Sequence, residues 1–289
     1  MNRRFQVLAW VAAVATYLLI VFGAIVRITG SGMGCGDHWP LCNGHLFPPL
    51  DDIATVIEWT HRLIAAVIAV PITATALYAW MLRRSGSADA PSKAAYWALG
   101  LLIPQALLGA ITVKLELPHW TVVLHLGTAM LLFAALLLAA IGQRTTDGGW
   151  RSIERSARGA LMIGFFTVLL GGMTAKMGAA GACQGFPLCN GQIWPTGGGL
   201  EHIHWIHRLF AYGLTLHVIG WVVRQRKLES WKGGPYMILG FVSLQVLVGA
   251  GMVLANLPPA MQAIHVAVGT AVWAALVIVA AGTTRRGSL

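Results

Sequence analysis

Eight long apolar runs constrain this chain more than any other feature of its sequence. They cover roughly residues 5–27, 55–82, 95–113, 120–142, 158–176, 203–224, 235–254 and 260–282. A helix needs about 20 apolar residues to cross the hydrocarbon core of a bilayer, and within lipid it satisfies its own backbone hydrogen bonds. Only 10% of the residues are charged, against about 25% in a soluble domain, and the eight runs leave little chain for one. The sequence therefore predicts an all-α integral membrane protein with eight transmembrane helices.

The formal net charge of +10 indicates an orientation rather than a nucleic-acid partner. If the N-terminus lies inside, most of the Lys and Arg residues fall in the inner segments, as the positive-inside rule requires. We therefore expect a multi-pass protein of the cell (cytoplasmic) membrane, surrounded by lipid, with both termini in the cytoplasm and no nucleic-acid partner.

The chain contains one pattern twice. The loop "WPLCNGHLFPP" (39–49) returns as "FPLCNGQIWPT" (186–196), and "EWTHRLIA" (58–65) returns as "HWIHRLFA" (204–211). Two later matches are "QALLGAITV" (105–113) with "QVLVGAGMV" (245–253), and "VVLHLGTA" (122–129) with "QAIHVAVGTA" (262–271). Four matches in the same order predict a duplicated four-helix bundle.

Each copy has an even number of helices, so both insert with the same orientation. We therefore expect two tandem bundles related by a pseudo-twofold axis along the membrane normal. The first bundle is expected over 1–142 and the second over 159–289, with a cytoplasmic linker at 143–158.

The four cysteines form one pair in each copy, and both pairs lie in loops expected outside the membrane. Thiols there are oxidised, so we predict the disulfides Cys35–Cys42 and Cys183–Cys189. Each bond either staples a short loop or acts as a redox pair. The spacing is not the C-x-x-C of redox thiols, which favours a rigid cap over something beneath.

Four histidines occupy equivalent helix positions in the two copies, near the outer ends of their helices: His61, His125, His207 and His265. Ionisable groups inside a membrane are usually functional, although a hydrogen-bonded structural role fits any single one. Two facing imidazoles suit haem iron, whereas zinc prefers cysteines or carboxylates alongside. We predict two haem sites toward the outer face. Glycines at positions 23, 109, 172 and 249 fit either close helix packing or clearance for a flat macrocycle.

The copies differ at Glu58, whose counterpart is His204. Each precedes its histidine by one helical turn, so a carboxylate near the first haem is expected to steer protons or stabilise charge. A Glu at a helix start also interacts favourably with the helix dipole. Arg62 and Arg208 follow their histidines and either pair with haem propionates or extend to the lipid headgroups.

Together, the four helix histidines, E-x-x-H-R (Glu58–Arg62), the second H-R (His207–Arg208) and the cysteine-pair loops resemble the haem A synthase family over essentially the whole chain. The resemblance is to the bacterial type with two cysteine pairs. It implies an oxidoreductase that converts the C8 methyl of haem O to a formyl group by two successive hydroxylations, giving haem A.

By this resemblance, His61 and His125 hold the substrate haem O in the first bundle, with Glu58 near the reacting methyl. His207 and His265 hold a haem b that relays electrons in the second bundle. An electron donor is required, and a haem O synthase is a candidate partner.

Three other functions compete with this interpretation. A di-haem b-type electron-transfer cytochrome explains the four histidines equally well, but gives no reason for Glu58 in one copy alone. A thiol-oxidising protein predicts C-x-x-C and has no use for the histidines. A transporter favours broken helices and polar residues near mid-membrane, whereas the polar helix residues here gather near one end.

Overall fold

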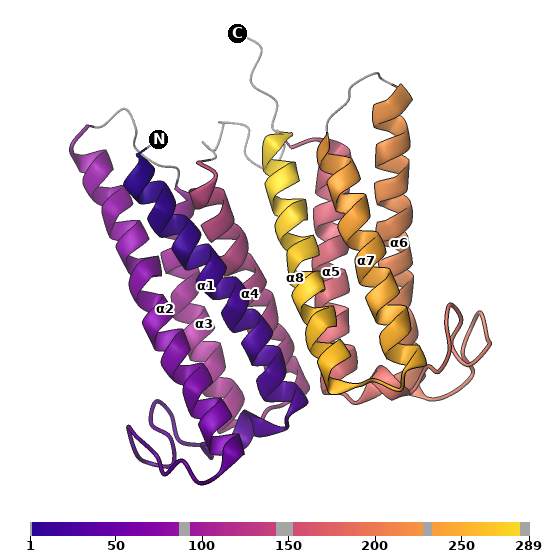
Figure 1. The fold of residues 1–289 in the computed structure, drawn as a ribbon, viewed down its shortest axis with the longest axis horizontal. Helices are drawn as coiled ribbons and strands as arrows, with labels where there is room; N and C mark the ends of the chain where they lie inside the picture. The colour runs from indigo at the N-terminus through magenta and orange to yellow at the C-terminus, as the bar shows by residue number, and fades with distance from the viewer. Residues whose placement is uncertain (1, 87–92, 143–152, 228–232, 284–289) are drawn as a thin grey trace. The chain divides into compact units, whose positions relative to one another are not determined.

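The computed structural model describes residues 2–86, 93–142, 153–227 and 233–283, and over these ranges the chain is helical with short loops. All eight long helices are long and apolar enough to cross a membrane, which confirms the predicted class. The chain divides into two compact units, Met1–Thr145 and Thr146–Leu289. Each unit contains four of the long helices (Figure 1). The protein is a multi-pass membrane protein.

In the first unit, each helix packs against two neighbours to form a closed ring. Its helices are α1 (Arg3–Ile28), α2 (Ile53–Arg84), α3 (Ala94–Lys114) and α4 (His119–Ala140), with the short 3-10 helix η1 (Ser31–Met33) after α1. Helices α1 and α3 each contact both α2 and α4. Therefore α2 and α4 stand at opposite corners of the ring. Figure 1 shows the long α1–α2 loop at the end of this bundle away from the N-terminus.

The second unit repeats this ring. Its helices are α5 (Arg155–Lys176), α6 (Gly199–Lys227), α7 (Gly233–Leu254) and α8 (Pro259–Gly282), with the 3-10 helix η3 (Ala179–Gly181) after α5. Helices α5 and α7 each contact both α6 and α8, so α6 and α8 occupy opposite corners. The long loop of this unit joins α5 to α6.

Small residues allow the helices of the first bundle to approach closely at the end away from its long loop. The cluster there is mostly alanine, sealed by the fully buried Phe5. Small residues favour close helix contact in membranes because they let backbones come together. This tightly packed end leaves the loop end of the bundle as the place where larger polar groups gather.

Helix boundaries lie within a few residues of those predicted. Helix α2 begins after Asp52, whose side chain accepts a hydrogen bond from the Thr55 amide at 2.8 Å, as a helix N-cap does. Helix α5 begins at Arg155, inside the segment expected to be linker. The rest of that segment, residues 143–152, lies outside the described residues.

Candidate functional site

Each of the four helix histidines lies against a glycine of the helix that precedes it in the chain. The pairs are Gly23 with His61, Gly109 with His125, Gly171 with His207 and Gly249 with His265. A Cβ atom added at these glycines would stand 3.3, 3.2, 3.0 and 3.0 Å, respectively, from Cε1 of the imidazole. Any larger residue would push against the ring. The glycines therefore set where each imidazole lies.

The histidines occupy corresponding depths. His61 and His207 lie in the third turn of α2 and α6, and His125 and His265 lie in the second turn of α4 and α8. Within each bundle the two rings come from opposite corners and are within electrostatic range of each other. Each bundle thus places two imidazoles from diagonal helices within electrostatic range of each other, at its loop end.

In the first bundle, the histidine level lies between two buried layers. The layer at the loop end contains Val26, Thr55, Glu58, Val113 and Thr121, and the layer on the other side contains Thr16, Ile68, Ala98, Gly127 and Ala129. Between them, the segments 17–25, 59–67, 99–109 and 122–126 contain no fully buried residue. Side chains therefore fill the bundle less tightly at the level of His61 and His125 than on either side.

The second bundle has the same change in packing. Buried residues follow the histidine level at Leu161, Leu214, Val242 and Thr270, toward the end away from the loop. The segments 165–173, 209–213, 243–254 and 259–269 contain no fully buried residue. Side chains therefore fill the second bundle less tightly near its histidine level than toward the end away from the loop.

The four imidazoles have different hydrogen-bond partners. Gln105 of α3 lies 3.2 Å from Nε2 of His125, and Gln245 of α7 lies 3.2 Å from both ring nitrogens of His265. Nδ1 of His207 lies 3.1 Å from the carbonyl oxygen of Thr167 on α5. Nδ1 of His61 is buried without a hydrogen-bond partner.

The residues present fit a haem. Haem iron takes axial ligands from opposite faces, and each bundle offers two imidazoles from opposite corners at one level. Within the described ranges, no group of three or more His, Cys, Asp or Glu side chains is placed to hold a metal ion. Paired histidines therefore favour haem over a site such as zinc.

Glu58 lies one turn from His61 and connects α2 to the disulfide loop above it. Glu58 as a whole is only 3% exposed. The amide of Cys35 donates to its Oε2 at 2.8 Å, and the Arg62 guanidinium donates to its Oε1. Arg62 also donates to the carbonyls of His38 at 2.6 Å and Leu41 at 2.8 Å. Glu58 and Arg62 therefore form a buried ion pair that fixes the loop on the helix.

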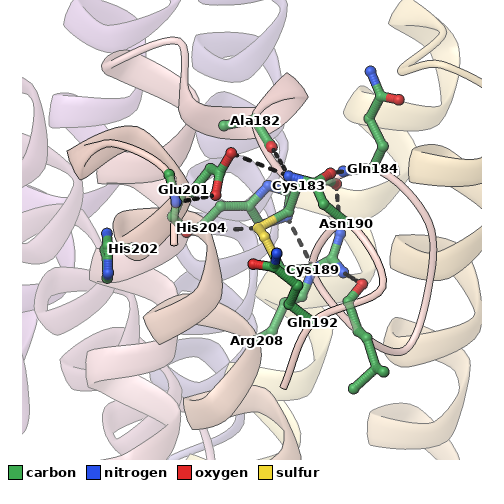
Figure 2. The surroundings of a disulfide bond; sticks show 12 residues. Ala182, Cys183, Gln184, Cys189, Asn190, Gln192, Glu201, His202, His204 and Arg208 are labelled. Carbon is green, nitrogen blue, oxygen red and sulfur yellow. Dashed lines mark hydrogen bonds between the residues drawn. A yellow bond between two sulfur atoms is a disulfide. The ribbon is translucent and has the colours of Figure 1, made fainter. Parts of the chain in front are cut away.

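His204 and Arg208 connect the corresponding loop to α6 with a neutral partner in place of the carboxylate (Figure 2). Nε of Arg208 donates to Nε2 of His204 at 3.3 Å, while Nδ1 of His204 lies 3.1 Å from the carbonyl of Ala179. The Arg208 guanidinium donates to three loop carbonyls, those of Cys183, Gly185 and Leu188, at 2.8 to 3.0 Å. An arginine therefore holds the loop on the helix in both bundles, with Glu58 beside it in the first and His204 in the second. The carboxylate of Glu201 holds the second loop separately, accepting from Asn190 and from the Gly197 amide.

Both predicted cysteine pairs are joined by disulfides. Cys35 bonds to Cys42 and Cys183 bonds to Cys189, and all four residues are almost completely buried. In each loop the second cysteine forms a short backbone bridge to the residue three positions later. Figure 2 shows the second disulfide beside His204 and Arg208. The first disulfide therefore lies over the start of α2, which carries His61, and the second lies over the start of α6, which carries His207.

The structure places the predicted site residues in two groups. Within each bundle, the two histidines lie on diagonal helices within electrostatic range of each other. Glu58, Arg62 and Arg208 make contacts to the loops. A role for either arginine at haem propionates stays a prediction. Sequence reasoning gave no role to Gln105 and Gln245. The only signal for them was their constant spacing of 20 residues from His125 and His265.

Taken together, the fold and site define a membrane protein built from two helical bundles, each with a histidine pair suited to haem. A family model described as "COX15-CtaA: Cytochrome oxidase assembly protein" matches residues 6–277. The chain belongs to this family.

Proteins similar to this chain include enzymes of haem metabolism. A protein named "Heme A synthase" from Alkalihalophilus pseudofirmus is 33% identical over 227 residues, covering 76% of this chain and 75% of that protein. One of the same name from Bacillus licheniformis is 30% identical over 270 residues, covering 89% and 88%. A "Protoheme IX farnesyltransferase" from Thermus thermophilus is 30% identical over 301 residues, covering 97% of this chain but 48% of that protein.

Proposed function

We propose that this protein is a haem A synthase, an oxidoreductase that converts the C8 methyl of haem O to the formyl group of haem A. The family and its similar proteins support this activity. The single structural observation that carries it is the asymmetry of two otherwise equivalent histidine pairs. Only the first pair has a buried carboxylate, Glu58, one helical turn away. An electron-transfer cytochrome with two equivalent haems has no need of this difference.

In this proposal, the first bundle holds the substrate and the second holds a resident cofactor. His61 and His125 bind haem O by its iron, and His207 and His265 bind a haem b, whose iron supplies one-electron transfer when bound. Gly23 and Gly109 set the position of the substrate-binding rings. The two bundles are the copies of a tandem duplication, related by a pseudo-twofold axis along the membrane normal.

Glu58 is the proposed catalytic residue. Its carboxylate has two fixed donors, the Cys35 amide and the Arg62 guanidinium, so the position of its oxygens is set before substrate binds. Preorganised charge of this kind stabilises charge that develops in a transition state. Hydroxylation of the methyl by dioxygen takes up two protons with two electrons from the donor and releases water, and the carboxylate is placed to hold or pass those protons. The disulfide loop above it keeps bulk water from that end of the bundle.

The charge pattern indicates the orientation of the protein in its membrane, and the similar proteins indicate its partners. The protein lies in the cell membrane with both termini in the cytoplasm and both haem sites toward the outer face, because its basic residues gather in the segments expected inside. The relative named as a farnesyltransferase carries a region like this whole chain within a protein twice as long. This favours a haem O-making enzyme as a partner that delivers the substrate. The electron donor is a separate partner.

Haem analysis tests the function. The protein is expressed in cells that make haem O but have no haem A synthase of their own, and the haems are extracted and separated by mass. We expect haem A, with some of its hydroxylated precursor. Haem O that stays unchanged, in cells where the protein is folded and carries haem, would contradict the proposal and favour the electron-transfer cytochrome.

A further inference from the structure

The two bundles differ in how they hold the histidine of their second helix. Nδ1 of His207 lies 3.1 Å from the carbonyl oxygen of Thr167. A carbonyl only accepts hydrogen bonds, so Nδ1 is the protonated nitrogen and Nε2 is the one left to bind iron. Nδ1 of His61 is equally buried and has no partner. Its tautomer and ring orientation are therefore not fixed by a hydrogen bond.

Gly171 makes this contact possible. It lies on α5 one turn after Thr167, and its missing side chain lets the His207 ring come to 3.0 Å from the place where a Cβ would be. In the first bundle Gly23 gives His61 a similar approach, at 3.3 Å, yet no hydrogen bond follows. The difference is therefore one hydrogen bond, rather than a difference in how close the helices come.

The histidines of the fourth helices differ in the same sense. Gln105 lies 3.2 Å from Nε2 of His125, whose Nδ1 is buried without a partner, whereas Gln245 lies 3.2 Å from both ring nitrogens of His265. Nδ1 therefore lacks a partner in both histidines of the first bundle and has one in both histidines of the second. At His207 that partner is a backbone carbonyl, which helix α5 holds in place, so the comparison of His61 with His207 isolates a single contact.

A hydrogen bond from the outer nitrogen of a metal-bound imidazole fixes the ring and makes it a stronger ligand, and loss of such a partner typically costs about 10–100-fold in metal affinity. We propose that the Thr167 carbonyl, bonded to Nδ1 of His207, makes the haem of the second bundle the retained one, whereas the unpartnered His61 makes the haem of the first bundle exchangeable. This inference rests on the proposed function, in which one haem is substrate and must leave as product. Thr167 and Gly171 are positioning residues for the cofactor.

A fifth histidine supplies the control. His217 of α6 lies 2.8 Å, by its Nε2, from the carbonyl of Ser156 on α5, and a Cβ at Gly159 would stand 2.7 Å from its Cε1. This contact has the same chemistry as that of His207, between the same two helices. It lies toward the other end of the bundle, so it ties α5 to α6 without reaching the histidine pair.

Haem capture measures retention in each bundle separately. One full-length variant carries His61→Ala and His125→Ala, and the other carries His207→Ala and His265→Ala, so that each keeps one histidine pair. Both are loaded with protohaem, purified in detergent and mixed with an excess of apomyoglobin, and haem transfer is followed by absorbance. We expect the first bundle to lose protohaem about 10–100-fold faster than the second. Equal rates, or slower loss from the first bundle, would overturn the inference.

The hydrogen bond itself is tested by Gly171→Ala in the variant that keeps only the second pair, with Gly159→Ala as the matched control. The added methyl at 171 displaces the His207 ring from Thr167. We expect about 10–100-fold faster haem loss and a more positive reduction potential, because a weaker imidazole donor stabilises ferric iron less. Gly159→Ala is expected to leave both values unchanged. Equal effects from the two variants, or a potential that does not move in Gly171→Ala, would count against the Thr167 contact.

The outcomes separate this inference from the proposed function. Purified protein that binds no protohaem at either pair refutes the haem function as a whole. Binding at both pairs with equal exchange refutes only the role of Thr167.

Discussion

Replacing Arg62 by methionine tests the strongest electrostatic contact in the site. Arg62 is the charged partner of Glu58, and the side chains are 14% and 4% exposed. Methionine keeps the apolar length of the side chain and removes every donor. Glu58 then retains only the Cys35 amide at 2.8 Å. The loop carbonyls of His38 and Leu41 also lose their donor, but these residues are exposed, so water takes its place.

The cost is therefore dominated by the unpaired carboxylate. Removing one partner of a buried ion pair costs about 3–5 kcal/mol. We expect a cost at the lower end of this range, about 3 kcal/mol. Because the Glu58 carboxylate accepts its remaining hydrogen bond from the Cys35 amide of the loop, this cost appears as easier opening of the loop. Lost contacts to exposed carbonyls add about 1 kcal/mol. Each 1.4 kcal/mol is about tenfold in an equilibrium constant, so the unpaired carboxylate makes the loop open roughly 100-fold more often and the total effect approaches about 1,000-fold.

Amide hydrogen exchange over the segment containing Cys35 measures this opening, with the disulfide reduced during quenching. The control is Arg62→Met in a protein that already carries Glu58→Gln, where no carboxylate is left unpaired. There, Arg62→Met is expected to speed exchange by about tenfold or less. Equal effects of Arg62→Met with and without Glu58→Gln would refute the reasoning, because they would mean that Arg62 does not stabilise the carboxylate.

Three further predictions concern the same end of the bundles. Glu58→Gln is expected to keep the loop closed and haem bound while haem A production falls at least tenfold, whereas His204→Gln leaves production unchanged; extracted haems from the two variants check this. Replacing both Cys35 and Cys42 by serine is expected to destabilise the loop by about 2.5 kcal/mol through its unfolded-state entropy, seen as faster amide exchange there with haem still bound. Hydrogen bonds from Thr55 hold the pKa of Asp52 below its ordinary value of 3.8. The Asp52 cap therefore stabilises α2 above pH 3.8, and this stabilisation is lost as the pH falls through the lower pKa of the folded state. Amide exchange at the start of α2, corrected for intrinsic rates, should rise on acidification in the wild type but not in Asp52→Asn.

The helices and the cysteine pairs were predictable from sequence because each follows from local chemistry. An apolar run of spanning length has only one stable conformation in lipid, so α1 to α8 lie close to the predicted spans. The repeat also pointed to the glycines, with one error of detail. Sequence matching pairs Gly172 with Gly23, whereas the structure sets Gly171 against His207. One residue turns a helix by about 100°, and apolar helices give little sequence information about their rotation.

Contacts between elements were less predictable. Glu58 and Arg62 are four residues apart, a spacing at which helix side chains meet, but their contacts with the loop depend on how "GDHWPLC" (36–42) folds back over α2. The partners of His207 and His125 come from α5 and α3, and only helix packing brings them together. No spacing rule reveals that one imidazole has a carbonyl partner and its counterpart has none.

The identity of the haem that each bundle retains shows whether the first bundle holds the substrate and the second holds the cofactor. The variant with His61→Ala and His125→Ala, and the one with His207→Ala and His265→Ala, are expressed in cells that make haem O, and the haem retained by each is identified by mass. We expect haem b alone in the first variant, unoxidised haem O in the second, and haem A in neither. Haem A formed by either variant, or haem O retained by the second bundle, would contradict it.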